Sequence, residues 1–222
     1  DLQKPSAVGR SAAEKAIQRL NPKKINSCKA SVVFDKRISN DLLGYLASAI
    51  SGPAIARETS FLKDSLHKQI FSKEISIIDS PKIKKGLGSR PFDGEGIKTS
   101  EKELVSNGKL NMWILNTSTA KKLNLKTTGH ASRSVGSPPG VGTSNLYMAN
   151  GINSFDDMIK SIKSGFYATE LIGMGVNLIT GDYSMGASGL WIENGEIAYP
   201  VNEITIASNL KEMFLNLSAA ND

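Results

Sequence analysis

Cysteine, histidine and long apolar runs are scarce in this sequence, and each scarcity excludes a class of protein. The single cysteine, Cys28, rules out an internal disulfide framework and fits a reducing compartment. No apolar run is long enough to span a bilayer, and no signal-peptide pattern is visible, so we expect a cytoplasmic protein with no membrane partner. His67 and His130 are the 2 histidines and no His-Glu pair occurs, which disfavours a zinc-peptidase site built on one helical face.

Signatures of other catalytic classes are also missing. No complete Gly-x-Ser-x-Gly frame is present, and Cys28 has no histidine near it in sequence, so neither a serine nor a cysteine nucleophile is indicated. No lysine follows a glycine frame as a P-loop requires. The pair Gly173 and Gly175 lacks the third glycine of a dinucleotide fingerprint, because Leu178 stands there.

The net charge of +6 and the pI of about 9.3 raise nucleic acid as a partner. The basic residues are nevertheless scattered in short clusters, such as Lys84-Lys85 and Lys121-Lys122, with no long basic helix and no aromatic-flanked recognition pattern. A solvated basic surface is the simpler interpretation, and it disfavours nucleic acid.

Apolar periodicity and turn residues predict an α+β fold, with a largely antiparallel sheet core, packed helices and two Asn-Gly hairpins. The hairpin turns are expected at Asn107-Gly108 and Asn194-Gly195, because both residue types tolerate positive φ. Helices are predicted over 5–20, 41–50, 61–66, 118–123 and 155–163 and after Ser208 or Asn209. Strands are predicted over 30–34, 75–78, 103–105, 110–115, 145–148, 190–192, 196–201 and 203–206. Ser39 or Asn40 is expected to cap the 41–50 helix, which is apolar on most sides and should be largely buried.

Two long Gly/Pro-rich loops, over 80–100 and 127–143, hold the candidate binding residues. Asp93 and Glu95, each followed by glycine, are most simply turn residues, and a substrate-binding role is the alternative. His130 and Arg133 are the better candidates for touching a ligand, since binding groups concentrate on loops carried by a rigid sheet. A purely structural role for these two residues stays open.

Several runs of this sequence resemble the TldD/PmbA peptidase family, in its PmbA-type (TldE) branch. The run GVNLITGDYSMGASGLWIENGEIAYPVNEITIASNLKEM is similar to the C-terminal signature of that family, and SRPFDGEG, TTGHASR and TSNLYMANG follow in family order. The likeness covers nearly the whole chain. It implies that residues 1–27 form a linker helix after an N-terminal domain absent from this sequence, and that residues 28–222 form the C-terminal PmbA/TldD-type domain.

The resemblance also implies a function, and this sequence departs from the family's zinc-binding motif. The family forms a cytoplasmic metalloprotease that processes unfolded peptides, including leader peptides and antitoxins, and the TldD-type subunit carries His-Glu-x-x-x-His and a C-terminal cysteine at its zinc site. Leu43, Gly44 and Ser48 stand at the corresponding positions here, and the chain ends at Asp222 without that cysteine. We therefore expect no catalytic residue and no cofactor in this chain, with zinc in a TldD-type partner.

The expected partners are a TldD-type subunit and unfolded peptides, with a homodimer in isolation as a further option. Two alternatives stay open. One is a regulatory binding protein linked to DNA gyrase, which an old family name and the basic pI suggest. The other is an independent hydrolase with an unrecognised site.

Overall fold

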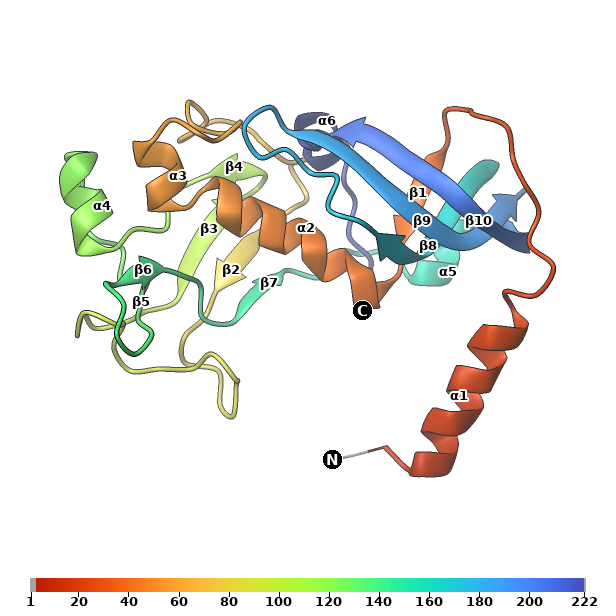
Figure 1. Ribbon diagram of the computed structural model, residues 1–222, viewed down its shortest axis with the longest axis horizontal. Helices are drawn as coiled ribbons and strands as arrows, with labels where there is room; N and C mark the ends of the chain where they lie inside the picture. Colours follow the sequence, from red (N-terminus) through yellow and green to blue (C-terminus); the bar gives the residue numbers. More distant parts are fainter. Residues whose placement is uncertain (1–2, 222) are drawn as a thin grey trace. The chain divides into compact units, whose positions relative to one another are not determined.

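The computed structural model describes residues 3–221 and confirms the α+β prediction (Figure 1). By its contacts the chain divides into two compact units, each assembled from three separate segments. The first unit comprises residues 1–39, 154–175 and 184–207, and the second comprises residues 40–153, 176–183 and 208–222. No helix within 3–221 combines the length and apolar character needed to cross a membrane.

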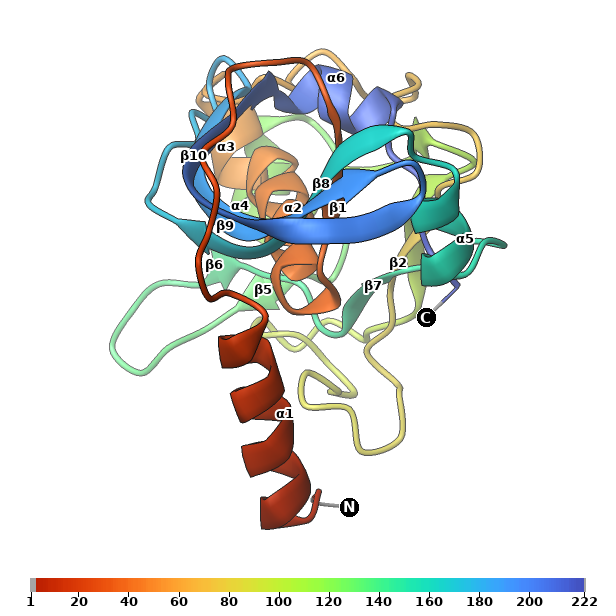
Figure 2. The same cartoon turned by 90° about the vertical axis from the view of Figure 1, so that its right-hand side faces the viewer.

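The first unit is built on a four-stranded sheet with the order β1-β8-β9-β10, whose strands lie side by side in Figure 2. Its elements are α1 (Pro5–Ile17), β1 (Ser31–Phe34), α5 (Phe155–Lys160), β8 (Ser164–Ile172), β9 (Asp182–Glu193) and β10 (Glu196–Asn209), the last two crossing into the second unit at one end. β1 pairs with β8 in parallel, and β8 pairs with β9 antiparallel. β9 and β10 are joined by two residues, a connection that only antiparallel strands allow.

Glycine permits two features of this sheet. Asn194 and Gly195 have φ values of 51° and 83°, as a type I′ hairpin turn requires. At Gly189 in β9, an added Cβ would lie 2.0 Å from the carbonyl oxygen of Tyr167, so a larger residue would push β8 away. The buried side chains of the sheet include Phe166, Trp191 and Ile192. α1, by contrast, has no buried residue.

The second unit holds a sheet with the order β4-β3-β2-β7, in which each neighbouring pair is antiparallel. Its strands are β2 (Ile77–Asp79), β3 (Lys102–Ser106), β4 (Lys109–Leu110) and β7 (Leu146–Met148), and a small ribbon pairs β5 (Ala131–Ser132) with β6 (Gly140–Val141). Its helices are most of α2 (Lys36–Ala49), α3 (Gly52–Ala56), α4 (Thr117–Lys122) and α6 (Leu210–Leu215). Asn107 and Gly108, with φ values of 47° and 74°, turn β3 into β4.

Aromatic stacking organises the core of the second unit. The rings of Phe71 and Phe214 stack with centroids 4.4 Å apart, and Phe61 contacts Phe214 at 6.2 Å. The same unit contains further fully buried aliphatic residues: Leu46, Ile50, Ile75, Ile77, Leu104, Leu110 and Leu115. Each fully buried side chain of this kind contributes about 2 kcal/mol of hydrophobic free energy.

Several local predictions are wrong. The strand predicted over 110–115 continues only to Leu110, where β4 ends. No helix forms over 61–66, because the amide of Phe61 donates to the Leu178 carbonyl and the chain continues as isolated turns. α2 begins at Lys36, since the Asp35 carboxylate accepts from the Arg37 amide at 2.9 Å and replaces Ser39 or Asn40 as the cap. The same helix buries only one face, through Leu42, Leu46 and Ala49, and is not largely buried.

Candidate functional site

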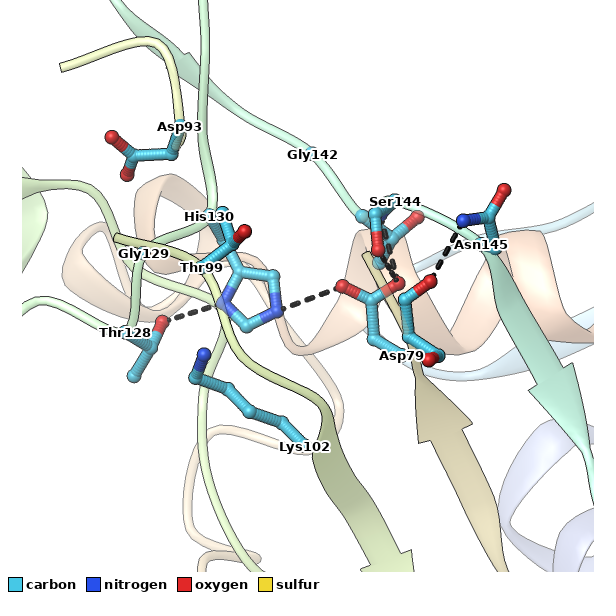
Figure 3. A network of polar contacts seen from close by, with 12 residues as sticks. Asp79, Asp93, Thr99, Lys102, Thr128, Gly129, His130, Gly142, Ser144 and Asn145 are labelled. Atoms are coloured by element: carbon cyan, nitrogen blue, oxygen red, sulfur yellow. Dashed lines mark hydrogen bonds and ion pairs between the residues drawn. The ribbon is translucent and has the colours of Figure 1, made fainter. Parts of the chain in front are cut away.

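A buried polar cluster joins the two long loops of the second unit around His130 (Figure 3). His130 and Asp79, whose exposed fractions are 2% and 3%, face each other with His130 Nε2 3.2 Å from Asp79 Oδ2. The other ring nitrogen, Nδ1, lies 2.8 Å from the Thr128 hydroxyl. Asp79 ends β2, and His130 lies just before β5, so strand ends position both groups.

Both oxygens of the Asp79 carboxylate have hydrogen-bond donors. Its Oδ1 atom accepts from the amide and from the hydroxyl of Ser144, each at 2.8 Å, while Oδ2 faces His130. Burial raises the pKa of Asp79, but the hydrogen bonds from His130 and Ser144 oppose it, and the pKa lies below its ordinary value. The carboxylate is therefore ionised at neutral pH and is stabilised by fixed donors.

Lys102 supplies a cation close to this cluster. Burial lowers the pKa of its ammonium group, against the opposing influence of the Asp79 and Asp93 charges. Lys102 Nζ donates to the carbonyl and the hydroxyl oxygen of Ser100, both at 3.1 Å. The partly exposed ammonium group is therefore held by Ser100, and the Asp79 and Asp93 charges act on it without a direct ion pair among the described contacts.

A hydroxyl, an imidazole and a carboxylate in this order also form the arrangement of an activated nucleophile. Here the Thr128 hydroxyl is already held on other sides: it accepts from the Leu115 amide at 2.7 Å and lies 3.2 Å from the Leu115 carbonyl oxygen. The imidazole it contacts is shielded from solvent. The geometry favours a structural tie between loops over a nucleophile.

Asp93 and Glu95, predicted as turn residues or binding residues, hold loops together in the structure. Asp93 Oδ1 accepts from the amides of Glu95 and Ile97 at 2.9 Å, and Oδ2 accepts from the Ala131 amide at 3.0 Å. Glu95 Oε2 accepts from the amide and hydroxyl of Thr117 at the start of α4. A carboxylate at a helix N-terminus is favourable for that helix.

His130 and Arg133, predicted on one loop, lie in different environments. His130 is buried, and its two ring nitrogens pair with Asp79 and Thr128, which favours the structural role that the sequence left open. Arg133 is exposed just after β5. Asp93 and His130 are thus drawn together through Ala131, while Arg133 stays at the surface.

The residues that complete the cluster, Asp79, Thr128 and Ser144, were not singled out from the sequence. Ser144 lies 65 residues from Asp79 in the chain, so no local motif joins them. The available signal was weak: Asp79 is an acidic residue directly after the apolar run Ile75–Ile78, where a strand was predicted.

The helix position expected to carry a zinc motif does not fit a metal. Leu43, Gly44 and Ser48 lie within α2, where Gly44 and Ser48 are exposed and Leu43 is half-buried. Leucine and glycine side chains carry no donor atom, so this set cannot form a zinc site. Across residues 3–221, no group of three or more His, Cys, Asp or Glu side chains is arranged to hold a metal ion.

The first unit carries a second feature, an open pocket beside an edge strand. It has a volume of about 420 Å³ and is lined mainly by Tyr167, Leu190, Ile197 and Tyr199. Lys23 Nζ lies 4.3 Å from the centroid of the Tyr199 ring. β10 is the last strand of its sheet, and the Lys23 segment bridges it at Val201. The pocket therefore offers an apolar surface next to strand backbone.

The fold and sequence define the class of this protein: the chain belongs to the PmbA/TldA metallopeptidase family, whose C-terminal domain model matches residues 27–222. The resemblance found in the sequence is thereby confirmed. The chain is 45% identical over 217 residues to Metalloprotease PmbA of Escherichia coli O157:H7, covering 98% of this chain and 46% of that protein. It is 33% identical to a metalloprotease of Methanothermobacter thermautotrophicus, covering 95% of this chain and 46% of that protein. The chain thus spans about half the length of the curated relatives it matches.

Solved structures agree with this assignment. A Thermotoga maritima protein, named for modulation of DNA gyrase, superposes with a TM-score of 0.90 at 36% identity, covering 99% of this chain and 51% of that one. TldE from Thermococcus kodakarensis superposes with a TM-score of 0.86 at 25% identity, covering 96% of this chain and 49% of that one.

Proposed function

We propose that this chain is part of a non-catalytic, PmbA/TldE-type subunit, which pairs with a TldD-type subunit in the cytoplasm and helps it process unfolded peptides. One observation carries the proposal: the α2 positions where the family resemblance puts the zinc motif hold Leu43, Gly44 and Ser48, and leucine and glycine side chains carry no donor atom. The hydrolytic metal would then belong to the partner. Residues 1–27 would connect this part to an N-terminal domain, and residues 28–222 would form the C-terminal domain.

The contribution of this chain would be to hold peptide. An extended peptide can add to an exposed strand edge, where backbone hydrogen bonds give affinity without regard to sequence. β10 ends its sheet next to the apolar pocket that Tyr167 and Ile197 line; the Lys23 segment covers its edge at Pro200 and Val201, and the peptide would pair with the rest of that edge. In the second unit, exposed Arg133 would offer a cation to a substrate carbonyl or carboxylate.

The test is reconstitution. The full-length protein and the TldD-type subunit of the same organism would be purified alone and together, and each sample would be assayed for cleavage of an unfolded peptide. We expect a complex, no cleavage by this protein alone, and cleavage by the mixture that a chelator abolishes. Chelator-resistant cleavage by this protein alone would instead support an independent hydrolase.

A second candidate function is regulation of DNA gyrase, and the names of relatives favour it. The Thermotoga maritima protein, and one from Bacteroides thetaiotaomicron that superposes with a TM-score of 0.87, both carry that name. The basic pI is compatible with it. Tight DNA binding that weakens steeply with salt would support this candidate.

A further inference from the structure

The chain that leaves α1 passes the outer edge of β10 and covers part of it (Figure 2). The amide of Lys23 donates to the Pro200 carbonyl at 2.8 Å, and Lys23 forms a parallel bridge with Val201. Asn21, with a φ of 55°, redirects the chain between α1 and this contact. Residues 21–24, here named the strap, therefore occupy the edge as a very short added strand.

The two lysines of the strap contact side chains of the same strand. Lys23 Nζ lies 4.3 Å from the centroid of the Tyr199 ring, within the range of a cation–π contact. Lys24 Nζ lies 3.8 Å from Glu203 Oε2. The Tyr199 hydroxyl donates to Glu193 Oε1 at 3.2 Å, which brings a carboxylate to the hydroxyl end of the ring. A strand edge, an aromatic face and a carboxylate thus receive consecutive basic residues.

This part of the sheet is acidic, although the chain as a whole is basic. Residues 184–207 include Glu193, Glu196 and Glu203 but no lysine or arginine, whereas the whole chain has a net charge of +6. Carboxylates with no basic residue on their own strands favour a cationic partner. The strap is the partner that the chain itself provides for Glu203.

The contacts that hold the strap are weak. Residues 21–24 are all exposed. The side chains of Lys24 and Glu203 are 87% and 73% exposed, and an ion pair so open to water contributes little. A cation–π contact at an exposed site is also modest. A competing segment that makes the same contacts, and one more, would therefore replace the strap.

The apolar pocket beside this edge offers that additional contact. Tyr199 and Pro200, which the strap contacts, also line the pocket of about 420 Å³, together with Leu190 and Ile197. No residue of the strap is among those that line it. A longer peptide on the same edge would place an apolar side chain in the pocket, which the strap does not do.

We propose that residues 199–203 of β10 and the adjoining pocket bind an extended peptide through consecutive basic residues, and that the strap occupies this site until such a peptide displaces it. This inference rests on the proposed function. It names basic, extended peptides as the substrate class and adds to the site the part of the edge that the strap covers.

Other occupants fit this edge less well. A nucleic acid or an acidic peptide would be repelled by Glu193, Glu196 and Glu203. A second copy of this chain, paired edge to edge, would bring the glutamates of two β10 strands together, and like charges on neighbouring strands are unfavourable. A basic peptide meets neither obstacle.

The experiment measures the affinity of the full-length protein for labelled, unstructured peptides at about 50 and 300 mM salt. One peptide carries a central Lys-Lys pair flanked by valines, and its match carries Gln-Gln in place of that pair. The Lys-Lys peptide should bind at least about fivefold more tightly at low salt, and the difference should shrink at high salt.

Removing the lysines of the strap tests the competition. A Lys23→Ala/Lys24→Ala variant should bind the Lys-Lys peptide at least about fivefold more tightly than the wild type, because a larger fraction of the protein then has a free edge. Tyr199→Leu and Glu203→Gln would also loosen the strap, so they are made in that double-variant background. There each should weaken Lys-Lys binding at least about threefold and leave Gln-Gln binding within about twofold.

Matched controls come from the second unit. Lys121→Ala/Lys122→Ala removes the same charge from exposed positions of α4, and so measures how far a lower net charge alone favours a basic peptide. Glu74→Gln removes an exposed carboxylate. Both should bind the Lys-Lys peptide within about twofold of the wild type, and melting temperatures should not change.

Each remaining outcome decides against the inference. Equal affinity for the two peptides, or a strap variant that binds within about twofold of its control, would overturn it and leave peptide cleavage by the reconstituted pair as the test of the proposed function. A strap variant that dimerises in light scattering, with no gain in peptide affinity, would mean that the strap only protects the edge. If neither peptide bound the wild type or the strap variant, the peptide-holding role would fall together with this inference.

Discussion

Replacing His130 by alanine tests whether the buried cluster is a structural tie. The change removes a hydrogen bond to the Asp79 carboxylate and leaves a void where a side chain 2% exposed had packed. A hydrogen bond to a charged group is worth about 1.5–3 kcal/mol, and loss of a whole buried pairing partner costs about 3–5 kcal/mol. Because Asp79 keeps both hydrogen bonds from Ser144, we expect the free energy of unfolding to fall by about 2–4 kcal/mol.

The assay can follow the second unit alone. The chain has 2 tryptophans, and Trp113 lies in the second unit while Trp191 lies in the first. In a Trp191→Phe background, Trp113 fluorescence during urea unfolding reports on the unit that holds His130. With a slope of about 2 kcal/mol per molar urea, the midpoint should fall by about 1–2 M.

The pH dependence gives an independent check. The pKa of Asp79 is lowered in the folded state, so its ionisation stabilises the fold above its unfolded pKa of about 3.9 and this stabilisation is lost as the pH falls through the folded pKa. Without His130 that lowering weakens. The difference in free energy of unfolding between the wild type and His130→Ala should therefore be larger at about pH 6 than at about pH 3.

A matched control uses the other histidine. His67 is exposed with a φ of 62°, which asparagine tolerates, so His67→Asn should change stability by less than about 0.5 kcal/mol. A loss below about 1 kcal/mol for His130→Ala, with no dependence on pH, would refute the view that the cluster ties the loops together.

Four further predictions address other features. Gly195→Val should cost at least about 1–2 kcal/mol, because φ is 83° and an added Cβ would lie 2.9 Å from the Lys160 carbonyl oxygen; an unchanged melting curve would contradict the turn assignment. Tyr167→Phe removes a 2.6 Å hydrogen bond to Asp35 and should lower the free energy of unfolding by about 1–2 kcal/mol above pH 4. The loss should be smaller below pH 4, since that bond helps to lower the pKa of Asp35. Equal losses in chemical denaturation at both pH values would argue against this reasoning. Metal analysis of the dialysed chain should find far less than one zinc per molecule, and a stoichiometric value would overturn the assignment of zinc to the partner. Arg133→Ala should slow peptide processing by the reconstituted pair without lowering the melting temperature, and full activity would remove Arg133 from the substrate site.

Local chemistry predicted much of the fold. The two Asn-Gly dipeptides indicated turns because asparagine and glycine tolerate positive φ better than most residues. The helix predicted from residue 155 is α5, and the Ser154 hydroxyl caps it by accepting from the Asp157 amide. The α6 cap was left between Ser208 and Asn209, and the structure selects Asn209. Each of these signals is complete within a few residues of sequence.

Features that depend on distant parts of the chain were missed. The nine-residue strand β8 was not predicted, since its buried side is formed partly by Gly165 and Ala168, which give little apolar periodicity. Its strand conformation depends on pairing with β1 and β9. Likewise, the composition of its loop made His130 a candidate for ligand contact. Only the fold shows that Asp79, at the end of β2, lies beside this loop and pairs with the His130 ring.

The division of the chain has a genetic consequence. Each unit is assembled from three separate segments that alternate along the sequence, and α2, β9 and β10 each contain residues of both. No single break in the gene could therefore separate one unit intact from the other, and recombination between relatives could not exchange one unit by one crossover. The two units must be inherited together, so a substitution that harms one of them is selected in the presence of the other.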